Sequence, residues 1–101
     1  MIESLLKSGG AELVAQLGSK FGLDDSVAQK VTDVSAQTLQ DGFLSEITSG
    51  NFDGILSLIN GKSSPAASAL TGNLTDSLVS GLLSKVGLKS DVAVKIAQLV
   101  I

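Results

Sequence analysis

The sequence predicts an all-α protein, and three observations lead to this prediction. The chain of 101 residues has a single proline, Pro65, and three aromatic residues, so its 44% of hydrophobic residues are mostly leucine, valine, isoleucine and alanine. Leucine and alanine are strong helix formers, and proline breaks helices. Apolar residues recur at helical spacing along the chain, and two of its segments, residues 13–35 and 78–100, are similar to each other. We therefore expect a compact bundle of six or seven short helices in one domain, residues 1–101.

The internal similarity is the most informative feature of the chain. Ten of the 23 aligned positions in residues 13–35 and 78–100 are identical at a constant offset of 65. The identical pairs are Leu13/Leu78, Val14/Val79, Leu17/Leu82, Ser19/Ser84, Lys20/Lys85, Gly22/Gly87, Leu23/Leu88, Val27/Val92, Ala28/Ala93 and Lys30/Lys95. Such similarity predicts two copies of one helix–turn–helix unit that pack against each other. It does not identify a function.

Each copy contains local signals for the end of one helix and the start of the next. We expect Gly22 and Gly87 to follow the first helix of each copy, because glycine adopts a left-handed conformation at little cost. Asp25 and its counterpart Ser90 are the expected N-caps of the second helices, since both side chains accept hydrogen bonds from first-turn N–H groups.

The rest of the chain is divided by glycine, asparagine and proline. A helical turn is expected at residues 3–8, before Gly9-Gly10. The second helix of the first copy is expected to end near Asp41-Gly42, and Gly72-Asn73 is expected to end a short helix that starts at Pro65. Further helices are expected at residues 11–21, 43–48, 52–59, 74–86 and 91–101.

The chain ends on an apolar Leu-Val-Ile sequence without a capping signal. Two explanations fit this ending. The apolar tail is buried against the core, or the natural chain continues beyond Ile101.

The residue types argue against catalysis. Histidine and cysteine are absent, which removes the usual general base, thiol nucleophile and thiolate metal ligands. Lys20 and Lys85 recur just before a glycine cap, where a cation is favoured by the helix C-terminus, so a serine/lysine catalytic pair is not needed to explain them. Asp24 and Asp25 lack the spacing of a calcium loop. We predict no enzyme activity, no catalytic residue, no cofactor and no metal.

Charge and hydropathy limit the partners. The formal net charge is −3 and arginine is absent, which argues against nucleic-acid binding. No stretch reaches the roughly 18 apolar residues of a spanning helix, and the first ten residues do not resemble a secretory signal. A cytoplasmic protein without membrane attachment is the expectation.

Two sequence patterns resemble the YidB-like bacterial proteins, a helical family of unknown function. One is Leu-x-x-Lys-Phe/Val-Gly-Leu followed by Val-Ala-x-x-Val/Ile, in residues 17–31 and 82–96. The other is the central Ser-Gly-Asn-Phe-Asp-Gly-Ile-Leu-Ser-Leu of residues 49–58. The resemblance implies an all-helical fold and a chain that continues with more apolar helix, and it implies no activity, cofactor or site.

The function expected from these observations is non-catalytic. A high apolar content without reactive side chains favours a protein-interaction or self-association module with an exposed apolar patch, whose residues the sequence does not identify. The alternative is binding of an apolar ligand or a membrane surface through a groove between the two copies. The serine, aspartate and glutamine of the polar faces disfavour attachment to anionic lipid.

Overall fold

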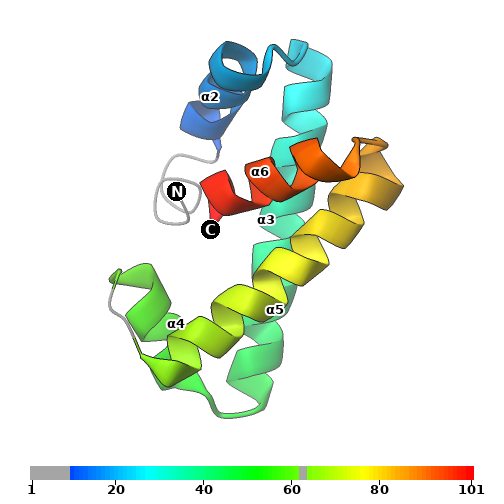
Figure 1. Ribbon diagram of the computed structural model, residues 1–101. Coiled ribbons are helices and arrows are strands. Elements are labelled where there is room, and N and C mark those ends of the chain that lie inside the picture. The colour runs from blue at the N-terminus through cyan, green and yellow to red at the C-terminus, as the bar shows by residue number, and fades with distance from the viewer. Residues whose placement is uncertain (1–9, 62–63) are drawn as a thin grey trace.

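The chain folds entirely as helices in the part that the structure describes, which confirms the predicted fold class. The computed structural model describes residues 10–61 and 64–101. In chain order the elements are α2 (Ala11–Phe21), α3 (Asp25–Thr48), α4 (Phe52–Ile59), α5 (Pro65–Gly81), a π-helical segment η1 (Leu82–Val86) and α6 (Ser90–Val100) (Figure 1).

Two expected helix ends do not occur. α3 continues through Gly42 to Thr48, and α5 continues through Gly72 into η1. Gly42 lies where α3 packs against α5, and a Cβ at this position would collide with the buried side chain of Leu74. This glycine therefore serves helix packing and does not stop the helix. The described residues hold five α-helices, so the expected six or seven are not confirmed, and the turn expected at residues 3–8 lies outside the described residues.

The two longest helices, α3 and α5, cross each other and organise the molecule. α2, η1 and α6 lie toward one end of this pair, and α4 lies at the other end (Figure 1). α3 contacts α2, α4, α5 and η1, while α5 contacts α3, α4, η1 and α6. The result is an elongated body with principal extents of 38 × 25 × 20 Å.

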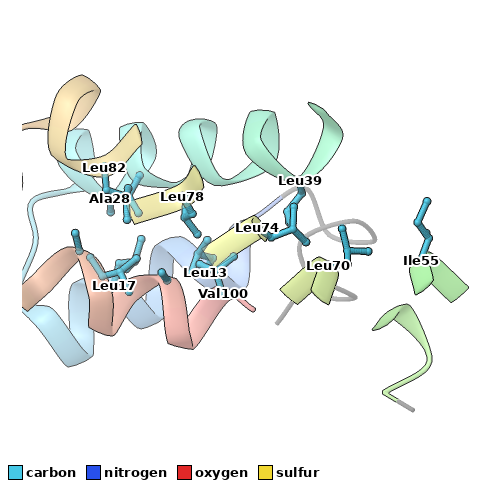
Figure 2. Close-up of a cluster of buried hydrophobic side chains, with 14 residues drawn as sticks. Leu13, Leu17, Ala28, Leu39, Ile55, Leu70, Leu74, Leu78, Leu82 and Val100 are labelled. Carbon is cyan, nitrogen blue, oxygen red and sulfur yellow. The ribbon is translucent and has the colours of Figure 1, made fainter. Parts of the chain in front are cut away.

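The hydrophobic core is thick at one end of the molecule and thin at the other. Leu13, Leu17, Leu78 and Leu82 are fully buried between α2, α3, α5 and α6. Toward α4 the core narrows, and Figure 2 shows Ile55 standing apart from the main group of side chains. Because burial of apolar surface is the main stabilising term, we expect the α4 end to be the less stable part.

The last residues of the chain lie against this core. Val100 is fully buried, and Ile101 is half-buried and packs on the core cluster. The apolar tail is therefore buried against the core.

The two similar segments have the same pattern of burial. At every aligned position of residues 13–35 and 78–100 the two residues are both buried, both half-buried or both exposed. The agreement extends to positions where the residue types differ, such as Ser35, which is paired with Val100; both are fully buried.

The turns inside the two segments are also alike. Gly22 and Gly87 have φ values of +65° and +82° and follow the first helix, at the positions expected from the sequence. The N–H of the next leucine donates to the carbonyl of Leu17 in one segment and of Leu82 in the other, at 3.4 and 3.3 Å. Each bond spans six residues, one more than the bond of a Schellman motif, and in both segments it ties the residue after a left-handed glycine to the preceding helical segment.

The N-caps differ from the expectation by one residue. α3 begins at Asp25 and α6 begins at Ser90, so the capping positions belong to Asp24 and Lys89, whose backbones are extended with ψ of 153° and 151°. Neither Asp24 nor Lys89 makes a side-chain capping hydrogen bond. The prediction that Asp25 and Ser90 are N-caps is wrong because the helical backbone already includes them. Asp25 in the first turn still interacts favourably with the helix dipole.

Candidate interaction surface

The structure gives the surroundings of the metal-ligating side chain types and of the two lysines next to the glycine turns. No set of three or more carboxylate, histidine or cysteine side chains there could hold a metal ion. Lys20 and Lys85 are exposed in the last turns before Gly22 and Gly87. The hydroxyl of Ser84, next to Lys85, donates to the backbone carbonyl of Ser80 at 2.9 Å, which is an ordinary bond of a helical serine.

An open groove of about 820 Å³ runs between α3 and α5. It is lined by Thr38, Asp41, Gly42, Ser45, Glu46, Leu70, Asn73, Leu74, Asp76, Ser77, Ser80, Gly81, Ser84 and Lys85. Most of these side chains are polar, and three of them are carboxylates. Pockets for apolar ligands are lined mainly by apolar and aromatic side chains, so this groove is poorly suited to such a ligand.

Four large apolar side chains are exposed at the α4 end of the molecule. They are Leu44 and Ile47 on α3, 60% and 47% exposed, and Phe52 and Leu56 on α4, 53% and 57% exposed. Each pair spans about one helical turn, so its two members lie on neighbouring parts of one helix face. We call these four residues the apolar end. Because α3 and α4 are in contact, the four side chains are presented at the same extremity of the molecule.

The sequence of α4 explains part of this exposure. The eight residues of α4, FDGILSLI, are amphipathic: the five apolar side chains share one side of the helix, and Asp53 and Ser57 lie on the other side. The apolar side of an amphipathic helix normally faces the core. Here the packing against α3 and α5 buries Ile55 and half-buries Leu58 and Ile59, and leaves Phe52 and Leu56 uncovered. The apolar side of α4 is therefore wider than the part that its packing buries, and the five apolar residues within eight positions are the sequence signal for this surface.

Three carboxylates lie close in sequence to the four residues of the apolar end. Asp41 lies one turn before Leu44 on α3, and Asp53 is exposed in the first turn of α4, beside Phe52. Glu46, next to Ile47, is half-buried. Residues 31–61 contain four acidic residues and no lysine, and the next lysine along the chain is Lys62. The surface thus combines exposed apolar groups with negative charge.

Comparisons of the chain with models of protein families, with curated proteins and with solved structures find no match. Within the described residues, no helix has both the length and the apolar character that crossing a bilayer requires.

Proposed function

We propose that this protein is a non-catalytic association module that binds another polypeptide through the apolar end. The observation that carries the proposal is the exposure of four large apolar side chains on two adjoining helices at one extremity of the molecule. Contiguous exposed apolar groups with polar surroundings are typical of protein–protein interaction sites. Aromatic anchors are enriched among the residues that dominate binding energy, and Phe52 would be such an anchor.

Two further assignments belong to this proposal. Residues 13–35 and 78–100 are two copies of one helix–turn–helix unit, which the matching burial and the two positive-φ glycines support. The chain is also placed with the YidB-like proteins, and the support for this is the pair of sequence patterns in residues 17–31 and 82–96 with the central residues 49–58.

The alternative, binding of an apolar ligand or a membrane surface, has less support. The groove between α3 and α5 is lined mostly by polar residues, and carboxylates flank the apolar end. Anionic lipid surfaces attract lysine and arginine and repel carboxylates. Flotation with neutral vesicles tests this alternative, and we expect the protein to stay in the unbound fraction.

Site-specific photo-crosslinking in the native cell tests the proposed function. The crosslinking amino acid p-benzoyl-phenylalanine replaces Phe52 in one variant and Leu83 in a control variant. Leu83 suits the control because it is 39% exposed but lies on η1, away from the apolar end. We expect a covalent adduct from position 52 and little or none from position 83, with both variants equally helical by circular dichroism.

The mass of the adduct identifies what is bound at this surface. An adduct with any polypeptide, including a second copy of the chain, supports an association function. Equal yields from positions 52 and 83, or no adduct from position 52, would contradict the proposal.

A further inference from the structure

We infer that the partner segment at the apolar end is basic and amphipathic, with apolar side chains flanked by lysine or arginine. This inference rests on the proposed function and adds the chemistry of the partner. Its basis is the position of the carboxylates around the four apolar side chains.

The negative groups are distributed on both helices of the surface. Asp41 and Glu46 belong to α3, and Asp53 belongs to α4. A segment that covers Leu44 and Phe52 would therefore bring its own flanking side chains within reach of these carboxylates. Complementary charge at the rim of an interface favours correct partners and raises the association rate.

The hydrogen bonds of these carboxylates leave their charge in place. Asp41 accepts a hydrogen bond from the side-chain amide of Gln37 at 2.9 Å, and Glu46 accepts one from the side-chain amide of Asn51 at 2.6 Å. Both donors are neutral, so they hold the carboxylates in position without cancelling the negative charge. A lysine or arginine from a partner would add a charge-assisted hydrogen bond, which is stronger than a bond between neutral groups.

The groove continues the negative surface along the molecule. Asp41 and Glu46 line both the groove and the region next to the apolar end, and Asp76 of α5 adds a third carboxylate to the groove lining. A basic segment that starts on the apolar end can thus extend along α3 and α5. The groove lining includes one cation, Lys85 of η1, at the end of the helix pair opposite to α4.

A second copy of the chain fits this surface less well. In a symmetric dimer the same patch of both copies meets itself, so the carboxylates of one copy would face those of the other. Like charges brought together at an interface cost binding energy and select against that partner. The charge pattern thus favours a foreign basic segment.

Binding of designed peptides, measured by fluorescence anisotropy on the complete chain, tests the inference. The probe is an amphipathic helical peptide of leucine and lysine. One control peptide has glutamate at every lysine position, and another has the leucine and lysine order shuffled so that no apolar face remains. We expect the lysine probe to bind at least tenfold more tightly than either control, with an affinity that falls as salt concentration rises.

Charge-matched variants locate the binding site. We expect Asp41→Asn/Glu46→Gln/Asp53→Asn to weaken binding of the lysine probe at least tenfold. The control Asp25→Asn/Asp33→Asn/Asp91→Asn also removes three carboxylates, all of them exposed and elsewhere on the molecule, and should change the affinity less than twofold. A second pair of variants makes the same comparison for the apolar contacts. We expect Leu44→Ser/Phe52→Ser to weaken binding of the lysine probe at least tenfold. The control Leu83→Ser/Val94→Ser should change the affinity less than twofold.

The inference fails if the lysine and glutamate peptides bind equally, or if both carboxylate variants lose the same affinity. It also fails, while the proposed function stands, if the adduct from position 52 is a dimer of the chain or contains a partner segment without basic residues. Absence of any adduct from position 52 would contradict the proposed function itself. The two failures are therefore distinguishable.

Discussion

Glycines that look alike in the sequence have three different roles. Gly22 and Gly87 adopt positive φ and end helices, and a side chain at either position would meet open space, so only the backbone requires glycine there. Gly42 has an ordinary helical backbone and is required because the side chain of Leu74 occupies the space where a Cβ would lie. Gly72 is also helical, but no atom lies within 4 Å of its missing Cβ. The surroundings of each residue therefore decide its role.

A pair of alanine substitutions tests these roles. Gly72→Ala should raise the free energy of unfolding by about 1 kcal/mol, because alanine favours a helix interior over glycine and meets no neighbour. Gly42→Ala gains the same propensity but overpacks against Leu74, which costs roughly 1–3 kcal/mol, so we expect a net loss of about 1 kcal/mol.

Equilibrium unfolding in urea measures both changes, with an unchanged m-value as the sign that the transition remains comparable. Equal stabilisation by both substitutions would show that α3 and α5 are not in close contact at Gly42.

At the scale of single elements, α5 is the helix that connects the two ends of the molecule. Its buried leucines recur every four residues, at positions 70, 74 and 78, and the pattern continues to Leu82 in η1. A spacing of four residues exceeds the 3.6 residues of a helical turn, so the stripe rotates by about 40° at each step. This rotation turns the apolar face from α4 at the start of α5 toward α6 at its end. The same helix therefore contributes to both the thin and the thick part of the core.

Leu78 of α5 and Leu83 of η1 provide a direct test of the stripe. Leu78→Ala should lower the free energy of unfolding by about 3 kcal/mol, because its side chain is fully buried and its loss leaves a cavity. Leu83→Ala, at a position that is 39% exposed, should change it by no more than about 0.5 kcal/mol.

Both substitutions change leucine to alanine in a helical segment, so the difference between their urea midpoints reports burial. Similar losses of unfolding free energy at the two positions would mean that the buried stripe of leucines does not pass through Leu78.

At the scale of the whole molecule, the two similar segments build the core, and the residues between them carry the exposed apolar surface. Residues 13–35 and 78–100 supply most of the thick core between α2, α3, α5 and α6. Residues 36–77 form the end of α3, the whole of α4 and the start of α5, and they carry the apolar end. The two similar segments thus stabilise the fold, and the residues between them present the proposed binding surface.

This division predicts uneven local stability. Amide hydrogens of α4 should exchange faster with solvent than those of α2 and α6, because Ile55, the buried side chain of α4, lies in the thin part of the core, whereas Leu13 and Leu17 of α2 and Ile96 of α6 are completely buried in the thick part. Hydrogen exchange followed by mass spectrometry measures this, and addition of the lysine probe peptide should slow exchange in α4 more than in α2.

Slower exchange in α4 than in α2 and α6 without any ligand would show that α4 is held more firmly than its thin core allows. Protection of α2 by the peptide, with α4 unchanged, would place the binding site elsewhere.

The sequence by itself determined the helical class and the two glycine turns. These features depend on helical periodicity and on the backbone preference of glycine, which act over a few neighbouring residues. The same local signals were misleading at Gly42 and Gly72, where helix ends were expected, and the N-cap positions were shifted by one residue at Asp25 and Ser90.

Only the tertiary structure decided which glycine allows a close helix contact and which apolar side chains remain uncovered. Gly42 is understood once Leu74, 32 positions further along the chain, is placed beside it. Phe52 and Leu56 are apolar like Ile55. Only the packing of α4 on α3 and α5 leaves the first two exposed and buries Ile55. Exposure depends on contacts between residues distant in the chain, and such contacts are set by how whole helices cross.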